Sequence, residues 1–237
     1  MSVLASTTAY WYLTRSTGAV ALLLATATVA LGVLDLRRWA TPAWPRFVVD
    51  ELHRNLALLT LVFLVLHILT SVLDSFAPIS ISAAVIPFVS PYRPFWLGLG
   101  ALSFDLLGAV TITSLLRRRI GFATWRAVHW LSYAAWPLAL LHGLGTGSDV
   151  KSGWLLTLSI ACVVVVLACV IVRAATGWPG VTPRLRGAAL AGAGGFALFL
   201  ILWLPGGPLG SEWARRSGTP KELLPKTKPA AHGSEGK

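Results

Sequence analysis

The stretch DELHRNLALLTLVFLVLH, residues 50–67, carries His53 and His67 in an otherwise apolar run. A second stretch, WRAVHWLSYAAWPLALLHG, residues 125–143, repeats this arrangement with His129 and His142. Each stretch is close to the ~20 residues that a helix needs to cross the hydrocarbon layer of a membrane. We therefore start from two predicted membrane-spanning helices that each carry two histidines.

The composition is that of a helical membrane protein. Mean hydropathy is +0.71, 55% of the residues are hydrophobic and 12% are charged, and the apolar residues come in long runs. Transmembrane strands would alternate apolar and polar residues, whereas runs such as 22–34 and 155–172 are apolar on every side. The sequence therefore predicts an all-α membrane protein and excludes a transmembrane β-barrel.

Six transmembrane helices are predicted, joined mostly by short loops. The longest connection, residues 74–94, holds four prolines around an apolar stretch too short to span, which indicates an interfacial or re-entrant segment. An extracytoplasmic segment, residues 1–9, precedes a bundle over residues 10–204. The basic tail, residues 205–237, is rich in Pro, Gly, Ser and Lys, which predicts disorder. The predicted spans are residues 10–34, 47–73, 95–116, 124–144, 154–172 and 188–204.

Basic residues gather in alternate loops, and this pattern predicts the orientation. Short loops rich in Lys and Arg stay in the cytoplasm. With an even number of spans, both termini of this multi-pass cell-membrane protein are then expected outside the cytoplasm. The basic tail is the contrary signal. The net charge of +11 is then mostly a topology signal, and nucleic-acid binding is not expected without a soluble basic domain. The basic loop residues are Arg37, Arg38, Arg46, Arg117, Arg118, Arg119, Arg126, Arg173, Arg184 and Arg186.

The four histidines fall at two matched depths. Because the second and fourth helices both run outward, His53 and His129 lie near the inner surface, and His67 and His142 lie ~20 Å further out. Imidazole is a common axial ligand of b-type haem, and a polar ring in hydrocarbon is costly unless something uses it. A single histidine could be a packing residue, but four at matched depths predict two b-type haems between helices 2 and 4.

Helix phase supports one histidine pair directly and the other only with a distortion. Fourteen residues at ~100° each end ~40° short of whole turns, so His53 and His67 share a face. Thirteen residues leave His129 and His142 ~140° apart on an ideal helix. Pro137 lies between them, and proline removes a backbone hydrogen bond and kinks a helix. We therefore predict a break near residues 133–137.

The two histidine stretches resemble the ferric reductase-like transmembrane domain of ferric reductases, NADPH oxidases and the membrane haem subunit of the bacterial methionine sulfoxide reductase system. The resemblance covers residues 10–173, and the 14- and 13-residue spacings are similar to those of the oxidases. In the family these histidines ligate two stacked haems, which implies the pairs His53 with His129 and His67 with His142. The resemblance thus implies a di-haem cytochrome b.

The chain departs from the NADPH-oxidising members of the family. Those members continue into flavin and nucleotide domains, whereas this sequence continues into a sixth helix and a tail without a glycine-rich phosphate loop. Electrons are therefore expected from a separate cytoplasmic flavin reductase, a reduced flavin or a quinol. The expected function is electron transfer from this donor to an extracytoplasmic acceptor, ferric iron or a redox partner protein. We therefore expect an oxidoreductase of the ferric reductase type.

Two other functions stay open. The chain could be a non-catalytic haem-bearing membrane subunit of a redox complex. It could also be a transporter that uses Arg15 and Asp105 as an intramembrane ion site.

Four charged residues near the predicted haems each have more than one interpretation. Arg15, which resembles an arginine beside the outer haem of the family, either pairs with a haem propionate or an anionic acceptor, or extends to the outer headgroups. Arg54 and Arg126 either bind inner-haem propionates or anchor the cytoplasmic end. Asp105, in mid-helix, is a proton-relay residue, a partner of Arg15 or a structural carboxyl.

Overall fold

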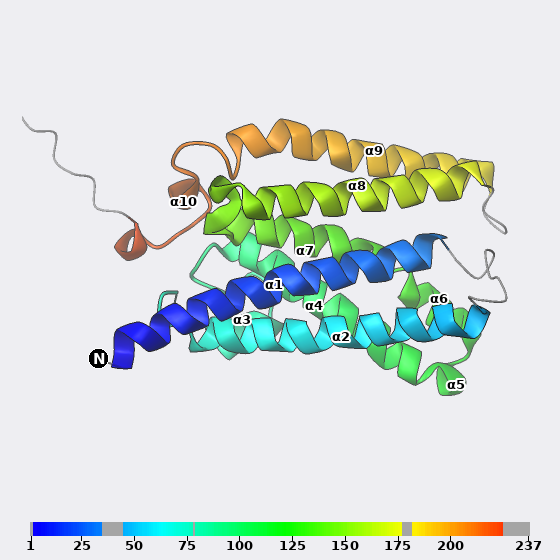
Figure 1. Ribbon diagram of the computed structural model, residues 1–237, viewed down its shortest axis with the longest axis horizontal. Helices are drawn as coiled ribbons and strands as arrows, with labels where there is room; N and C mark the ends of the chain where they lie inside the picture. Colours follow the sequence, from blue (N-terminus) through cyan, green and yellow to red (C-terminus); the bar gives the residue numbers. More distant parts are fainter. Residues whose placement is uncertain (1, 35–44, 78, 177–181, 225–237) are drawn as a thin grey trace, which may run out of the picture.

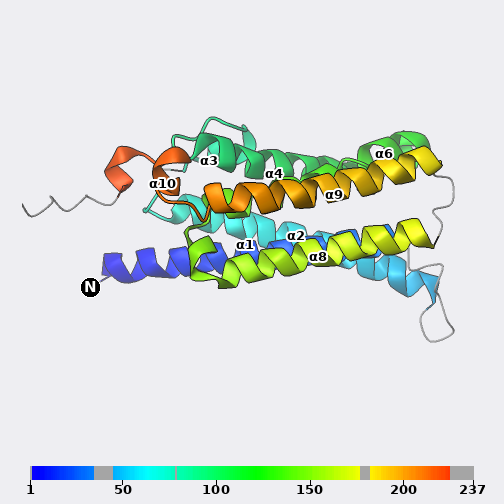
Figure 2. The ribbon, with the colours of Figure 1, turned by 90° about the horizontal axis from the view of Figure 1, so that it is seen from above.

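The computed structural model describes residues 2–34, 45–77, 79–176 and 182–224, and every regular element within them is a helix. Five of these helices are long and apolar enough to cross a membrane. Figures 1 and 2 show them running side by side along the longest axis of the molecule. The five are α1 (Ser2–Leu34), α2 (Arg46–Leu73), α4 (Pro94–Leu115), α8 (Trp154–Ala175) and α9 (Pro183–Gly206). The prediction of an all-α membrane bundle is confirmed.

The fourth predicted span, residues 124–144, is two helices rather than one. α6 (Phe122–His129) follows the short α5 (Arg117–Ile120), and α7 (Ser132–Thr146) begins after an interruption at Trp130 and Leu131. The described residues therefore hold five unbroken candidate spans. The remaining predicted span, the fourth along the chain, falls on α6 and α7.

The interruption lies just before the predicted position, residues 133–137. Leu131 N–H donates to the carbonyl of Val128 (2.9 Å) and Tyr133 N–H to that of Trp130 (3.2 Å), the three-residue pattern of a 3-10 turn. Pro137 itself stays inside α7. Because proline has no N–H to donate to the Tyr133 carbonyl, the regular helical pattern is already weakened one turn before it.

The ends of two helices differ from the sequence prediction. α1 begins at Ser2, so residues 2–9, predicted to precede the bundle, continue the first helix. The sequence predicts a disordered tail over residues 205–237, whereas the structure describes helical elements within residues 205–224. α9 runs to Gly206, and α10 (Trp213–Arg216) and a 3-10 turn (Lys221–Leu223) follow. Residues 225–237 lie outside the described residues.

The connection over residues 74–94 folds back onto the beginning of α4. It contains α3 (Ile81–Val85), whose first turn is capped by the Ser80 hydroxyl. Ala83 packs with Tyr92 and Leu97 in a small apolar cluster. This packing places the connection at the same end of the bundle as the last residues of α2 and α7.

The main apolar core joins α7 to α8 and α9. Leu140 and Leu144 of α7 are almost completely buried and pack against Cys162 of α8 and Leu200 of α9. On the other side of α7, the Ser103 hydroxyl of α4 donates to the Ala135 carbonyl at 2.8 Å. These contacts fix α7, which carries one of the predicted site histidines.

Replacing Leu140, which is 0% exposed, by Ala should lower the stability of the protein in detergent by about 2 kcal/mol, because the cavity that remains loses packing contacts. Leu198→Ala is the matched control, since that side chain is 56% exposed on α9. The measurement is the denaturation midpoint of each purified variant. Equal losses in the two variants would contradict the assigned core.

Candidate functional site

Four histidines meet in two facing pairs. α2 supplies His53 and His67, while His129 ends α6 and His142 lies in α7. The ring centroids of His53 and His129 are 6.3 Å apart, and those of His67 and His142 are 6.1 Å apart. The structure therefore brings together the same two pairs that the sequence predicts.

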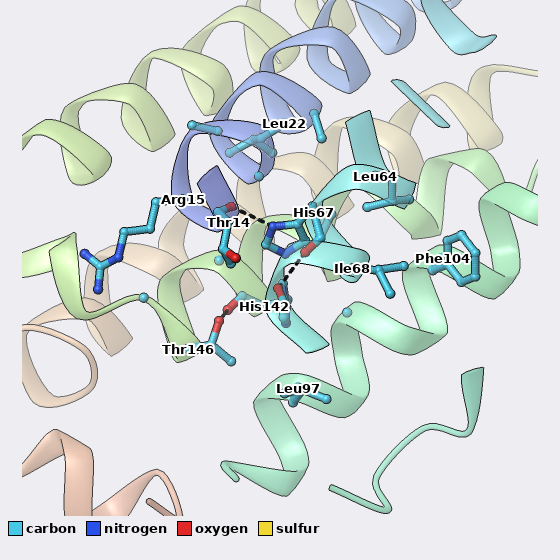
Figure 3. A pocket seen from close by; sticks show the side chains of 18 of the residues that line it. Thr14, Arg15, Leu22, Leu64, His67, Ile68, Leu97, Phe104, His142 and Thr146 are labelled. Atoms are coloured by element: carbon cyan, nitrogen blue, oxygen red, sulfur yellow. Dashed lines mark hydrogen bonds between the residues drawn. The ribbon is translucent and has the colours of Figure 1, made fainter. Parts of the chain in front are cut away.

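The outer pair, His67 and His142, is held through backbone carbonyls. His67 Nδ1 lies 2.8 Å from the Thr14 carbonyl oxygen of α1, and His142 Nδ1 lies 3.0 Å from the Trp96 carbonyl oxygen of α4. A carbonyl oxygen can only accept, so each Nδ1 carries a proton, and in a neutral ring Nε2 keeps its lone pair. Figure 3 shows both rings in one pocket, with His67 beside Thr14. In a neutral ring held in this way, Nε2 is the nitrogen available to a metal.

Glycines allow this close approach. A Cβ atom on Gly18 would lie 2.9 Å from His67 Nδ1, and one on Gly100 would lie 2.5 Å from His142 Nδ1. In each case the glycine stands four residues after the carbonyl that accepts the histidine proton, Thr14 and Trp96 respectively. The same local arrangement is therefore used twice, once on α1 and once on α4.

A third glycine faces the inner pair. A Cβ atom on Gly32 of α1 would lie 3.4 Å from His53 Cε1. Gly18 and Gly32 are separated by the same 14 residues as His53 and His67. Sequence reasoning missed these glycines, although this matched spacing was present as a signal.

The inner pair contains a buried nitrogen that lacks a partner. His129 Nδ1 is buried and makes no hydrogen bond to any residue that the structure describes. The Trp125 ring lies next to the His129 ring, with 5.0 Å between the centroids. A buried polar atom of this kind calls for an explanation, such as a bound group or water at the site.

A cavity of about 280 Å³ surrounds the outer pair. Apolar side chains, including Leu22, Leu64, Leu97 and Phe104, form most of its wall, as is typical of pockets that bind large apolar cofactors. The two imidazoles thus face a largely apolar chamber between α1, α2, α4 and α7.

Arg15 lines the rim of this cavity. Its guanidinium forms an ion pair with Asp149, in the 3-10 turn after α7 (Ser148–Ser152), and lies 3.4 Å from the centroid of the Trp11 ring. Asp149 thus fills a role that was one of three alternatives for Asp105, and the sequence had not pointed to Asp149 itself.

The two arginines predicted beside the inner pair are exposed. Arg54 Nη2 donates to Glu51 Oε1 at 2.6 Å, one turn away on α2, and the Arg54 side chain is 66% exposed. Arg126 is also exposed and lies over the Phe122 ring, 5.4 Å from its centroid. These contacts favour anchoring of the helix ends over binding of a buried anion.

The donor set fits a haem at each pair. A metal held between two imidazoles would lie about 2 Å from the nearest nitrogen of each ring. Because each ring centroid lies further from the metal than that nitrogen, the two centroids would be roughly 6 Å apart. The observed separations are 6.3 and 6.1 Å. The fixed Nδ1–H tautomers of the outer pair and the unpartnered His129 Nδ1 agree with this use of the imidazoles.

A helical membrane bundle with facing histidine pairs and an apolar chamber is the arrangement expected of a membrane haem protein. A family model described as "Ferric reductase like transmembrane component" matches residues 17–140, more than half of the chain. The chain therefore belongs to this family, whose transmembrane domains generally bind haem and serve electron transfer in membranes. Neither the curated proteins nor the solved structures gave a match.

Gly100→Ala should lower the haem content of the purified protein, because the added methyl group would displace the His142 ring. Gly108→Ala is the matched control on the same helix, since a Cβ atom there would meet nothing within 4 Å. The measurement is haem per chain by pyridine haemochrome absorbance. Full haem content in Gly100→Ala would contradict the geometry assigned to His142.

Proposed function

We propose that this protein is a di-haem cytochrome b that carries electrons across the cell membrane. The observation that supports this proposal is that α2 carries two histidines, each of which faces a histidine of α6 or α7. His53 and His129 would hold the inner haem, and His67 and His142 the outer one. The 14 residues between His53 and His67 correspond to ~20 Å along α2.

The residues of the chain would bind, orient and shield the cofactors. Haem, when bound, supplies reversible one-electron chemistry. The carbonyls of Thr14 and Trp96 hold the Nδ1 protons of the outer histidines, which orients the rings and raises their basicity as ligands. The apolar wall excludes water. Because two histidines would hold each haem, the site would be suited to passing electrons rather than to binding a substrate at the metal.

The proposed direction is from the cytoplasm outward. Arg117, Arg118 and Arg119 of α5 are exposed and directly precede α6, which carries the inner ligand His129. The positive-inside rule assigns such a basic end to the cytoplasm, which places both termini outside. The proposed donor is a separate cytoplasmic flavin reductase or another reductant. The proposed acceptor is ferric iron or a redox partner protein outside the cytoplasm.

Reduced-minus-oxidised spectra of the purified protein should show b-type bands with about two haems per chain, one for each histidine pair. His67→Ala should remove the outer haem and leave one haem on His53 and His129. His232→Ala is the matched control, because this histidine belongs to neither pair. Two haems retained in His67→Ala, or none in the unmodified protein, would contradict the proposal.

A vesicle assay tests transmembrane transfer itself. With a flavin reductase and NADPH inside and ferric citrate outside, the unmodified protein should reduce external iron, and His67→Ala should reduce it at the rate of empty vesicles. Haems that dithionite reduces but that pass no electrons to iron, or to any tested acceptor, would instead indicate a non-catalytic subunit.

A further inference from the structure

The segment that follows α9, residues 207–224, folds back against the elements that hold the outer pair. Figure 1 shows α10 beside the ends of α7 and α9. Trp213 Nε1–H of α10 donates to the Gly145 carbonyl at 3.1 Å, and the Arg93 N–H donates to the Gly218 carbonyl at 3.0 Å. The segment therefore contacts the last turn of α7 and the residue before α4.

Arg93 links these elements through its side chain. It is 5% exposed, and its Nη1 donates to the Gly145 and Thr146 carbonyls at 2.9 and 3.1 Å, while Nε donates to Thr219 Oγ1 at 2.9 Å. The last carbonyls of a helix have no partner within it and form the negative end of its dipole, so a guanidinium suits this position. Burial lowers the pKa of Arg93, but guanidinium stays protonated in proteins.

The backbone of Arg93 is also unusual. It has a φ of 43° at the N-cap of α4, a left-handed conformation that is uncommon for a residue with a side chain. Such a conformation persists only where surrounding contacts hold it in place. The four hydrogen bonds of Arg93 to residues 145, 146, 218 and 219 supply those contacts.

Trp96 connects α9 and the segment after it to His142. Its ring packs against those of Trp203 of α9 and Trp213 of α10, with centroid distances of 4.9 and 5.2 Å. A Cβ atom on Gly145 would collide with it. Its carbonyl accepts the Nδ1 proton of His142. The residue that holds the outer ligand is therefore itself held by α9 and by the segment after it.

We propose that Arg93, Trp203, Trp213 and Thr219 form a clamp that positions His142 and so tunes the outer haem. The inference rests on the proposed function, because it requires a haem on the outer pair. The clamp acts on one ligand of the outer pair, since the Nδ1 proton of His67 is held by Thr14 of α1 instead. Three of its four residues lie beyond the family match, which ends at residue 140.

The clamp has a consequence that differs between the two haems. A hydrogen bond from Nδ1 raises the basicity of the imidazole as a ligand, which stabilises ferric iron and lowers the reduction potential. Loosening the clamp weakens the bond from His142 to the Trp96 carbonyl. The potential of the outer haem should therefore rise, while that of the inner haem should stay unchanged.

Redox titration of the purified full-length protein, followed by electron paramagnetic resonance, tests the clamp. Trp213→Phe keeps a ring but loses the N–H donor, Trp213→Ala loses both, and Arg93→Lys keeps the charge but loses the fork of donors. Each should raise the potential of one haem, the one that His67→Ala removes, and change its resonance signal. Arg215→Ala is the control on the same short helix, since its side chain is 65% exposed.

Four results would overturn the clamp. One is unchanged potentials in all three variants, and another is an equal shift of both haems, which would indicate general loosening. A third is loss of haem in Trp213→Ala together with unchanged titrations of Trp213→Phe and Arg93→Lys. In these cases two haems in the unmodified protein would leave the proposed function intact. The fourth, an unmodified protein without haem, would reject the proposed function first and the clamp with it.

Discussion

An imidazole inside a membrane needs a partner for each of its ring nitrogens, because hydrocarbon offers none. In the outer pair the Nδ1 atoms of His67 and His142 donate to the carbonyls of Thr14 and Trp96. This leaves one basic nitrogen on each ring and brings the rings to 6.1 Å between centroids. Under the proposed function, a metal held between the two rings would satisfy both remaining nitrogens at once. The rest of the bundle can be understood as the support for this arrangement.

The close packing of helices follows from the same constraint. A histidine can reach a backbone carbonyl of a neighbouring helix only where that helix lacks a side chain, and Gly18 and Gly100 provide the gaps. Packing between membrane helices depends on such small residues, because lipid and apolar side chains attract a helix about equally. The α1 and α4 helices therefore act as the walls of the site, while α2, α6 and α7 supply its histidines.

The sequence was most informative where one residue type carried the signal. Long apolar runs predicted α1, α2, α4, α8 and α9, and the histidine spacing predicted which rings face one another. The ~140° phase gap between His129 and His142 is reduced at the turn before α7, since each residue of a 3-10 turn rotates by ~120° instead of ~100°. The position of that turn depends on tertiary packing and was displaced from the prediction.

Features that depend on contacts between distant residues could not be predicted. The segment after α9 is poor in apolar residues, so its composition indicated disorder, but Trp213 and Thr219 bind to α7 and Arg93. Likewise, residue type and spacing did not indicate that Arg15 pairs with Asp149, or that the carbonyls of Thr14 and Trp96 accept from the histidines. Each of these contacts pairs groups that lie far apart in the chain.

An electron cryomicroscopy map of the protein in lipid nanodiscs, purified with its native cofactors, tests the central claim most directly. The account predicts two planar densities, one continuous with the rings of His53 and His129 and the other with those of His67 and His142. A map in which the histidine rings contact each other directly or water, with no planar density between either pair, would contradict it.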